Sequence, residues 1–153
     1  MAHPLLCWDI CLEGLQRRMQ LADDLKTMQK IMKEKFWHNT LVSLGNTLVW
    51  ENKVIIITDT KLNIIHATEN IFAMNGYTQK DVIGRSPHMF QGAKTEITER
   101  QKIKIAVDKQ SSFESIITNY KKDGSIYKCH IEGYPVFNKK GKLVNFIAIE
   151  NAA

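Results

Sequence analysis

Cysteine and proline are scarce in this chain, which has three of each among its 153 residues. Cys7, Cys11 and Cys129 are odd in number and form no Cys-x-x-Cys pair, so the sequence indicates neither a disulfide framework nor a zinc site. We therefore expect reduced thiols in a cytoplasmic protein.

Long apolar runs and dense patches of one charge are also missing. The apolar segment from Pro4 to Leu12 is interrupted by Asp9 and lacks a basic leader, so we expect neither a signal peptide nor a membrane span. The net charge of +5 is spread along the chain among acidic residues, whereas nucleic-acid binding favours a concentrated basic stripe. We expect no membrane partner and no direct binding of nucleic acid.

Sequence patterns typical of enzymes are absent as well. Gly84, Gly92 and Gly124 are isolated and form no phosphate-binding loop, and no nucleophile elbow occurs. No pair of carboxylates is expected to converge in a cavity. We therefore expect that the protein is not an enzyme and that it has neither catalytic residues nor metal ligands.

The remaining composition is that of one globular domain with an accessory helix. Hydrophobic residues make up 44% of the chain and charged residues 24%, as in average soluble proteins. Between residues 12 and 36, apolar side chains recur every three or four positions, which predicts one amphipathic helix. The stripe consists of Leu12, Leu15, Met19, Ala22, Leu25, Met28, Met32 and Phe36.

This apolar stripe has two interpretations. Its narrow width and charged flanks are typical of a helix that pairs with a partner helix, but a helix that packs on its own domain would show the same spacing. The segment from Trp37 to Lys53 contains Gly45 and several asparagines, which indicates a junction. We expect an N-terminal helix and linker over residues 1–46 and a folded domain over residues 47–153.

Beyond the junction the hydrophobic period changes from 3.6 to 2, which predicts strands. We expect strands at residues 54–58, 63–67, 112–120, 125–137 and 143–150, and helices at 68–74, 78–81 and 95–110 with Thr68, Thr78 and Thr95 as N-caps. Because residues 54–57 are apolar on both faces, the first strand is expected inside the sheet. The order predicts an α+β fold, a five-stranded antiparallel sheet with short helices on one face.

Four short motifs mark this order of elements. They are Ile57-Thr58-Asp59, Asn75-Gly76-Tyr77, Val82-Ile83-Gly84-Arg85 and the stretch from Asn119 to Gly124. With these motifs in sequence, residues 50–151 resemble the Per-Arnt-Sim (PAS) family. The resemblance implies a sheet cupped by the middle helices, with a cavity between them that can hold a cofactor or metabolite.

The resemblance also assigns side chains to the two faces of the sheet. If Asn119 points into the cavity, strand alternation places Ser115 and Ile117 there too. The candidate cofactor-binding residues are Asn119, Gln91, Cys129, Glu150, Ile117, Ile131 and Phe146, with Phe113 and Ala148 on the same inner face. The outer face would carry Leu143, Ile147, Ile149, Tyr134 and Val136, an apolar surface that in this family is often covered by an N-terminal helix of the same chain or of a dimer partner.

Within the PAS family, the loop from Gly84 to Gly92 is similar to the loop of light-oxygen-voltage (LOV) photoreceptors that carries an adduct-forming cysteine. Pro87 stands at that position, so thiol adduct photochemistry is not expected. Asn119 and Gln91 match flavin-contacting residues of the LOV subgroup. The alternative is that both amides hydrogen-bond to backbone groups in the loop region.

Two positions depart from the flavin-binding pattern. Cys129 replaces an expected asparagine and Glu150 an expected glutamine, and an ionised carboxylate cannot donate a hydrogen bond as an amide does. Glu150 is expected to be a solvated strand end, and the alternative is a switch that relays changes in the cavity. Haem is not expected, because His66 in a strand and His88 in a loop form no signature of a haem site.

Together these features predict a PAS sensory and dimerisation module of a bacterial-type signalling or regulatory protein, which transmits its signal through the N-terminal helix. A homodimer is expected, with Leu15, Met19, Leu25, Met28, Met32, Ile147 and Ile149 at its interface. An effector domain outside this chain would receive the signal. The alternative is a flavin- or metabolite-binding PAS receptor that senses redox state without adduct photochemistry.

Overall fold

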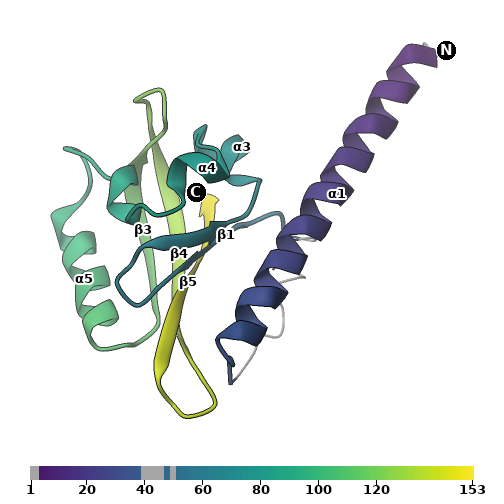
Figure 1. The fold of residues 1–153 in the computed structure, drawn as a ribbon. Helices are drawn as coiled ribbons and strands as arrows, with labels where there is room; N and C mark the ends of the chain where they lie inside the picture. The colour runs from purple at the N-terminus through teal and green to yellow at the C-terminus, as the bar shows by residue number, and fades with distance from the viewer. Residues whose placement is uncertain (1–3, 39–46, 49–50) are drawn as a thin grey trace.

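The computed structural model describes residues 4–38, 47–48 and 51–153, with side chains from Ile10 onward (Figure 1). Most of the predicted junction between Trp37 and Lys53, including the predicted domain boundary at residue 46, lies outside these residues. A sheet forms the centre of the molecule. One long helix lies against one side of the sheet, and the shorter helices lie on the other side.

Five antiparallel strands form this sheet in the order β2-β1-β5-β4-β3. The strands are β1 (Val54–Thr58), β2 (Ile64–Ala67), β3 (Phe113–Tyr120), β4 (Ile126–Phe137) and β5 (Leu143–Ala152). Each predicted strand is present, and its ends differ from the expected ones by two residues or fewer. The predicted α+β fold is therefore confirmed.

The first strand, β1, lies inside the sheet between β2 and β5. All five of its residues are buried, because side chains pack against both faces of the sheet at this point. The apolar run from Val54 to Ile57 is therefore that of a strand with two covered faces, as predicted. The edges of the sheet are β2 and β3.

Two glycines allow the tight turns between the last three strands. Gly124, between β3 and β4, has a φ of 88°, and Gly141, between β4 and β5, has a φ of 79°. Both values lie in the left-handed region that other residues disfavour. The register that results places Ile117 opposite Cys129, and Ile131 opposite Glu150.

The short helices lie between β2 and β3 in the chain. They are α3 (Ile71–Asn75), α4 (Gln79–Val82), the 3-10 helix η1 (Pro87–Phe90) and α5 (Ile97–Asp108). Gly76 ends α3 in the left-handed conformation. The predicted N-cap of α4 is confirmed and belongs to a capping box, since the Thr78 hydroxyl accepts the N–H of Asp81 and the Asp81 carboxylate accepts the N–H of Thr78.

Two other predicted N-caps are wrong. Asn70 and Glu96 occupy the N-cap positions of α3 and α5. The Thr68 hydroxyl instead accepts the N–H of Ile55 in β1, and the Thr95 hydroxyl donates to a backbone carbonyl of β3. Both threonines therefore tie a helix-bearing segment to a strand, a role that depends on tertiary contacts.

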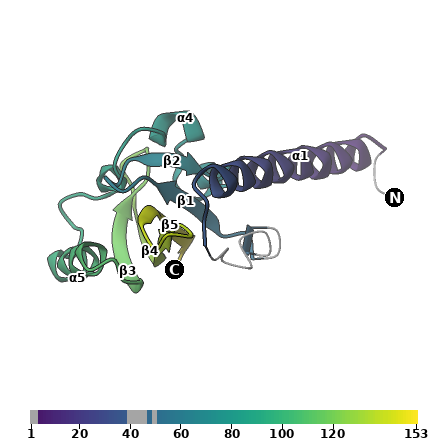
Figure 2. The ribbon, with the colours of Figure 1, turned by 60° about the horizontal axis from the view of Figure 1, so that its bottom comes forward.

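The N-terminal helix α1 (Pro4–Glu34) begins and ends earlier than predicted. Pro4 occupies its first turn, where the missing N–H of proline is tolerated, and Phe36 lies beyond its end with a φ of 52°. The 31 residues span about 46 Å. Only the C-terminal half lies against the sheet, and the N-terminal half projects away from the domain (Figure 2). Among the described residues no helix, α1 included, has the length and apolar character to cross a membrane.

A separate hydrophobic core lies on each face of the sheet. The outer core joins α1 to the sheet and consists of Met28, Trp37, Leu48, Ile55, Ile57, Val136, Ile147 and Ile149, with Leu21, Leu25, Ile31 and Met32 packed against it. The inner core joins the short helices to the sheet and consists of Val54, Ile56, Ile64, Ala67, Ile71, Val82 and Phe90. The helix that covers the outer face is therefore the chain's own.

A buried hydrogen-bond chain anchors the segment that follows α1. The indole Nε1–H of Trp37 donates to Asn145 Oδ1 in β5 at 2.9 Å, and Asn145 Nδ2 donates to the carbonyl of Thr58 at 2.9 Å. Because Trp37 and Asn145 are both buried, these bonds satisfy polar groups that water cannot reach. They fix the C-terminal end of the helical segment on the outer face.

Candidate functional site

A cavity of about 530 Å³ lies between α5, η1 and the inner face of the sheet. Its apolar walls include Ile56, Ile97, Ile103, Val107, Phe113, Ile131, Phe146 and Ala148. Polar side chains at its boundary include Thr58, His88, Gln91, Arg100, Lys104 and Glu150. Mostly apolar walls, a few polar groups and a volume of roughly 300–1,000 Å³ are typical of sites for small organic ligands.

The cavity exists because α5 does not pack closely on the sheet. None of the twelve residues of α5 is buried, and the apolar Ile105 is 55% exposed. Polar contacts hold the start of the helix on the edge strand instead. The Ser115 hydroxyl donates to Glu99, and Glu96 accepts both the N–H and the hydroxyl of Thr118. The helix is tied at one edge and leaves open volume beneath it.

The Glu96 carboxylate keeps this attachment charged. It pairs with the ammonium of Lys128 in addition to its two bonds with Thr118. The hydrogen bond from Lys128 and the bonds from Thr118 lower the pKa of Glu96 to about 2. Glu96 is therefore ionised throughout the physiological pH range, and the attachment of α5 does not change with pH there.

The hydroxyl of Thr58 is a buried polar group without a partner. Thr58 ends β1, lines the cavity and is 5% exposed, and its Oγ1 has no hydrogen-bond partner among the described residues. A buried hydroxyl without a partner destabilises the fold by roughly 1–3 kcal/mol. This oxygen is therefore free to form a hydrogen bond with a molecule in the cavity.

Glu150 adds a titratable group to the cavity wall. It is 4% exposed, and the Cys129 thiol donates to its Oε2 at 3.5 Å. Burial raises the pKa of Glu150 to about 7, so near neutrality a large fraction of this carboxyl group is protonated. A protonated carboxyl group both donates and accepts hydrogen bonds, and in that state Glu150 can replace an amide. The predicted solvated strand end is wrong, because β5 continues to Ala152 and pairs on both sides at this residue.

The sulfur of Cys129 is not a nucleophile in this environment. Burial raises the pKa of the Cys129 thiol, and the neighbouring Glu150 raises it further. A thiol that stays protonated lacks the thiolate that reacts with electrophiles. Pro87, at the start of η1, supplies no sulfur either.

Tyr127 is a half-buried residue with a buried hydroxyl that sequence reasoning missed. It precedes Cys129 by two residues in β4 and therefore shares its inner face, so strand alternation could have found it. Its hydroxyl and the Asn75 Nδ2 are buried and have no hydrogen-bond partner among the described residues. Burial raises the pKa of Tyr127. Asn119, 3% exposed, stands opposite Tyr127 in the register of β3 and β4.

The loop after η1 brings Gln91 to the cavity. Gln91 lines the cavity, and its Oε1 lies 3.2 Å from Nδ1 of His88. The chain then passes close to β3 at Gly92, where a Cβ atom would lie 2.5 Å from the ring of Tyr120. Any other residue at position 92 would push the loop, and Gln91 with it, away from the sheet.

The candidate cofactor-binding residues divide into two groups. Gln91, Glu150, Ile131 and Phe146 line the cavity, whereas Asn119, Cys129 and Ile117 are buried outside its lining. His66 does not reach the cavity. Its Nε2 lies 3.3 Å from Oδ1 of Asp24 in α1.

The predicted dimer-interface residues also divide into two groups. Met28, Ile147 and Ile149 belong to the outer core, and Leu25 and Met32 pack against it. Leu15 and Met19, on the projecting half of α1, are 54% and 60% exposed. The first group is engaged within the chain, which leaves Leu15 and Met19 available to a partner.

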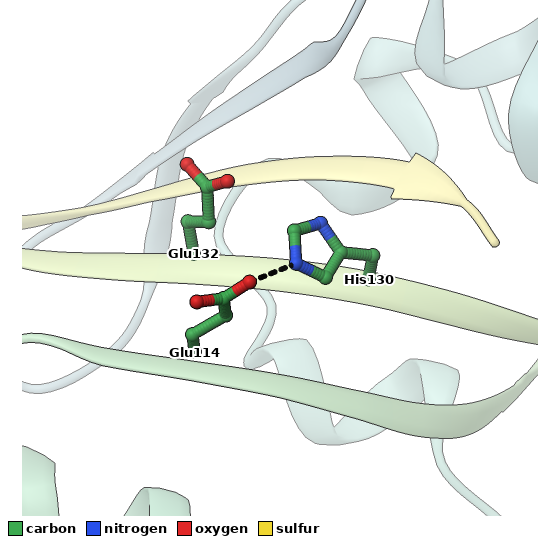
Figure 3. A group of neighbouring side chains, drawn as sticks. All are labelled: Glu114, His130 and Glu132. Atoms are coloured by element: carbon green, nitrogen blue, oxygen red, sulfur yellow. Dashed lines mark hydrogen bonds and ion pairs between the residues drawn. The ribbon is translucent and has the colours of Figure 1, made fainter.

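A group of charged side chains lies on the outer face of β3 and β4 (Figure 3). Glu114, His130 and Glu132 place three atoms of metal-ligand type within 4.8 Å of one another. His130 Nε2 lies 2.7 Å from Glu114 Oε1, and this hydrogen bond raises the pKa of His130. Glu132 accepts a hydrogen bond from Tyr134 at 3.3 Å and lies 3.9 Å from the Lys53 ammonium. The two carboxylates stand opposite each other in the register of β3 and β4. Other side chains of the protein therefore balance their negative charges.

The domain that contains the cavity is similar to known proteins. The family model described as PAS domain matches residues 52–151. Phototropin-2 of Oryza sativa subsp. japonica is 36% identical over 87 residues, which are 57% of this chain and 10% of that protein. Protein TWIN LOV 1 of Arabidopsis thaliana is 35% identical over 88 residues, which are 57% of this chain and 22% of that protein. The chain thus spans a small part of these relatives.

A solved structure has the same arrangement of elements. It is described by the words "Flavin Analogue Sheds Light on Light-Oxygen-Voltage Domain Mechanism", and it superposes on this chain with a TM-score of 0.68 at 22% identity. The superposition covers 72% of this chain and 84% of that one. At this level of identity the likeness concerns the fold.

Proposed function

Because this chain belongs to the PAS domain family, we propose that it is a sensory module that binds a small organic ligand beneath α5 and passes changes in that site to α1. The observation that carries the proposal is the cavity of about 530 Å³. Its walls are mostly apolar, and no side chain of the protein fills it. Unfilled apolar volume destabilises a fold. A ligand that fills it would remove this cost.

Three features of the cavity define the chemistry of its ligand. The apolar walls favour a ring system or another apolar body. Thr58 Oγ1 and the carboxyl group of Glu150 offer hydrogen bonds from the sheet. Arg100 is an exposed residue of α5 that lines the cavity, and its positive charge favours an anionic group at the rim. The neighbouring Lys104 is already paired with Asp108 at 2.7 Å. We infer a ligand with an apolar ring, a polar edge and an anionic substituent.

A flavin nucleotide has this combination of groups. Gln91, Thr58 and protonated Glu150 would hold the polar edge of the ring, and Arg100 would bind the phosphate. When bound, a flavin supplies absorption of blue light and reversible reduction. Because neither Pro87 nor the protonated Cys129 thiol offers a reactive sulfur, the proposed sensor works without a covalent adduct.

An absorbance spectrum of freshly purified protein tests this function, followed by heat release and mass analysis of bound compounds. We expect a released compound with a ring system and an anionic group. In Ala148→Phe the added ring would occupy the cavity, so the bound fraction should fall at least tenfold. Ile116→Phe adds a ring on the exposed outer side of β3 and serves as the control. Protein that releases no compound and binds no added flavin would contradict the proposal.

Dimerisation through α1 is a second function that a specific observation favours. The side chains of Ile10, Leu12, Leu15 and Met19 are all more than half exposed on the projecting half of the helix. Cys11, Leu15 and Met19 follow one another at four-residue intervals and share one face. We propose that two copies pair along this face as parallel helices, which places both domains at the same end. The paired helices would carry the signal to an effector domain of the full-length protein.

Cross-linking through the exposed thiol of Cys11 tests the parallel arrangement. In a parallel pair the two Cys11 residues lie side by side, so mild oxidation should produce a covalent dimer. The experiment uses a Cys7→Ser background, and Cys11→Ser is the control. A protein that sediments as a monomer and yields no covalent dimer would exclude this arrangement.

A further inference from the structure

Asp24 is a buried acidic residue on the helix face that contacts the domain. It is 2% exposed, whereas the neighbouring Asp23 is exposed. Met28, one turn further along α1, is part of the outer core. The face that carries Met28 therefore also buries a carboxylate, which apolar packing alone does not require.

The Asp24 carboxylate contacts three separate elements of the domain. Oδ2 accepts the backbone N–H of Glu69 at 3.0 Å. Oδ1 accepts Nε2–H of Gln79 in α4 at 3.0 Å and lies 3.3 Å from Nε2 of His66 in β2. Within the described part of the chain, every side-chain hydrogen bond from α1 to the domain is made by Asp24.

The energetic cost of this arrangement indicates a role other than stability. Removing a carboxylate from water costs several kcal/mol even in a relaxed protein, and a well-packed apolar residue often stabilises such a position as well or better. Buried polar groups can specify one arrangement among competing ones. For Asp24, the arrangement specified is the position of α1 relative to β2 and α4.

The position of Asp24 in the fold connects the two sides of the sheet. The helix α1 lies on the outer face, α4 belongs to the layer of short helices on the inner side, and β2 is the edge strand. Gln79 donates to Asp24 and also to the carbonyl of Ala67 at the end of β2, at 2.6 Å. The carboxylate therefore bridges the edge of the sheet, and a displacement of α4 would break a contact made by α1.

Beyond Asp24 the helix separates from the domain. A groove of about 720 Å³ lies between α1 and the α3–α4 segment, and on the helix side it is lined by Arg17, Gln20, Leu21 and Asp24. Residues 10–20 of α1 are exposed. Asp24 thus lies where the half of the helix that packs on the domain meets the exposed, projecting half.

We propose that Asp24 is a latch that couples α4 on the inner side of the sheet to the direction and mobility of α1. This proposal rests on the proposed function in one respect. The contacts of Asp24 would be the route by which a change among the short helices of the inner face reaches α1. With the latch closed, the contacts to His66, Glu69 and Gln79 hold α1 against the edge of the sheet. When α4 moves, the carboxylate loses Gln79, and the attachment of α1 to the domain weakens around Asp24.

Hydrogen–deuterium exchange of the whole chain without ligand tests the latch. Asp24→Ala removes all three contacts. Exchange over residues 18–30 should rise about a hundredfold, because two hydrogen bonds to the carboxylate are lost and each is worth a factor of about ten or more. Asp23→Ala is the matched control and should leave this exchange unchanged. Exchange in β3, β4 and β5 should change by less than twofold, which distinguishes release of the helix from unfolding of the domain.

A second pair of variants tests the coupling from the α4 side. Gln79→Ala removes one hydrogen bond to the carboxylate without altering α1, and exchange over residues 18–30 should rise about tenfold. Lys80→Ala, an exposed neighbour in α4, should have no effect. Equal exchange in Asp24→Ala and Asp23→Ala, or an equal rise over the whole domain, would overturn the proposal. Because no ligand is added, absence of a cavity ligand would leave this result intact, and the two proposals fail separately.

Discussion

The two faces of the sheet are covered in different ways. On the outer face α1 inserts apolar side chains, and Met28, Leu48 and Ile147 are almost completely buried. On the inner face, apolar side chains of α3, α4 and η1 also pack against the sheet. In contrast, α5 has no buried residue, and a cavity lies between it and the sheet. The difference follows from how each helix is attached. A helix held by apolar packing must fill the space beneath it, whereas a helix held at one edge by Glu96 and Glu99 can leave that space open.

The largest expected difference between the faces concerns truncation of apolar side chains. Met28→Ala should lower the free energy of unfolding by about 2–5 kcal/mol, because it opens a cavity in a filled core. Ile103→Ala should lower it by about 1 kcal/mol or less in ligand-free protein, because this side chain already faces open volume. Urea denaturation followed by circular dichroism measures both. Equal losses would show that the inner face is as tightly packed as the outer one.

A pH-dependent difference should follow from the buried carboxyl group of the inner face. Burial raises the pKa of Glu150 from its ordinary value of 4.5 to about 7, so the folded state binds this proton more tightly than the unfolded state. The contribution to stability is complete below pH 4.5, decreases as the pH rises toward 7 and is lost above it, a change on the order of 3 kcal/mol.

Glu150→Gln should flatten this dependence in urea denaturation curves recorded at pH 5 and at pH 8. The pKa of His130 is also raised, by its hydrogen bond to Glu114, and this adds a loss of the same sign as the pH increases. Both proteins are therefore compared in a His130→Asn background. If wild type and Glu150→Gln show the same slope, the buried carboxyl group is not the source.

A smaller effect is expected from the polar anchor of the outer face. Trp37→Phe keeps an aromatic ring in the core but removes the donor to Asn145 Oδ1. The unpaired buried amide should lower the free energy of unfolding by roughly 1–3 kcal/mol. A double-mutant cycle with Asn145→Leu measures the coupling. Asn145→Leu should lower the free energy of unfolding less in the Trp37→Phe background than in the wild-type protein. Additive losses would mean that the two side chains act independently.

The smallest effect on stability is expected from substitutions in the projecting half of α1, which packs on neither face of the sheet. Leu15→Glu with Met19→Glu should change the free energy of unfolding by less than about 0.5 kcal/mol, because both side chains are exposed. The same pair should shift the protein from dimer to monomer in sedimentation, because it places charges in the proposed helix pair. Leu25→Glu, in the clamped half, should instead destabilise the domain itself. A double variant that stays dimeric would move the interface away from this half of the helix.

Local sequence signals predicted most of the fold. The β-branched run of β1, the Asp123-Gly124 turn and the capping box at Thr78 each act within a few residues, so their structural outcome depends little on distant contacts. The resemblance to the PAS family then placed Phe146 and Glu150 on the inner face, and both line the cavity. These predictions held because side-chain direction in a strand is set by the backbone alone.

Long-range contacts account for what could not be predicted. A hydrophobic period identifies an amphipathic helix, but it does not show which part of the helix packs on the domain. The exposed Leu15 and the buried Met28 therefore belonged to one predicted stripe. Asp24 interrupts the contact face with a charge, and its partners lie 42 or more residues further along the chain. The sequence predicted the helix α5 but not its attachment, in which Glu96 and Glu99 hold it at the edge of the sheet through contacts with β3.

The amino-acid order by itself specified five strands, their faces and an N-terminal amphipathic helix, because these depend on the alternation and spacing of neighbouring residues. Tertiary structure alone decided that α1 is clamped over half its length, that Asp24 joins the two sides of the sheet, and that Glu150 is buried with a raised pKa. Burial and desolvation are properties of the surroundings of a side chain. They arise only when segments far apart in the chain pack against one another.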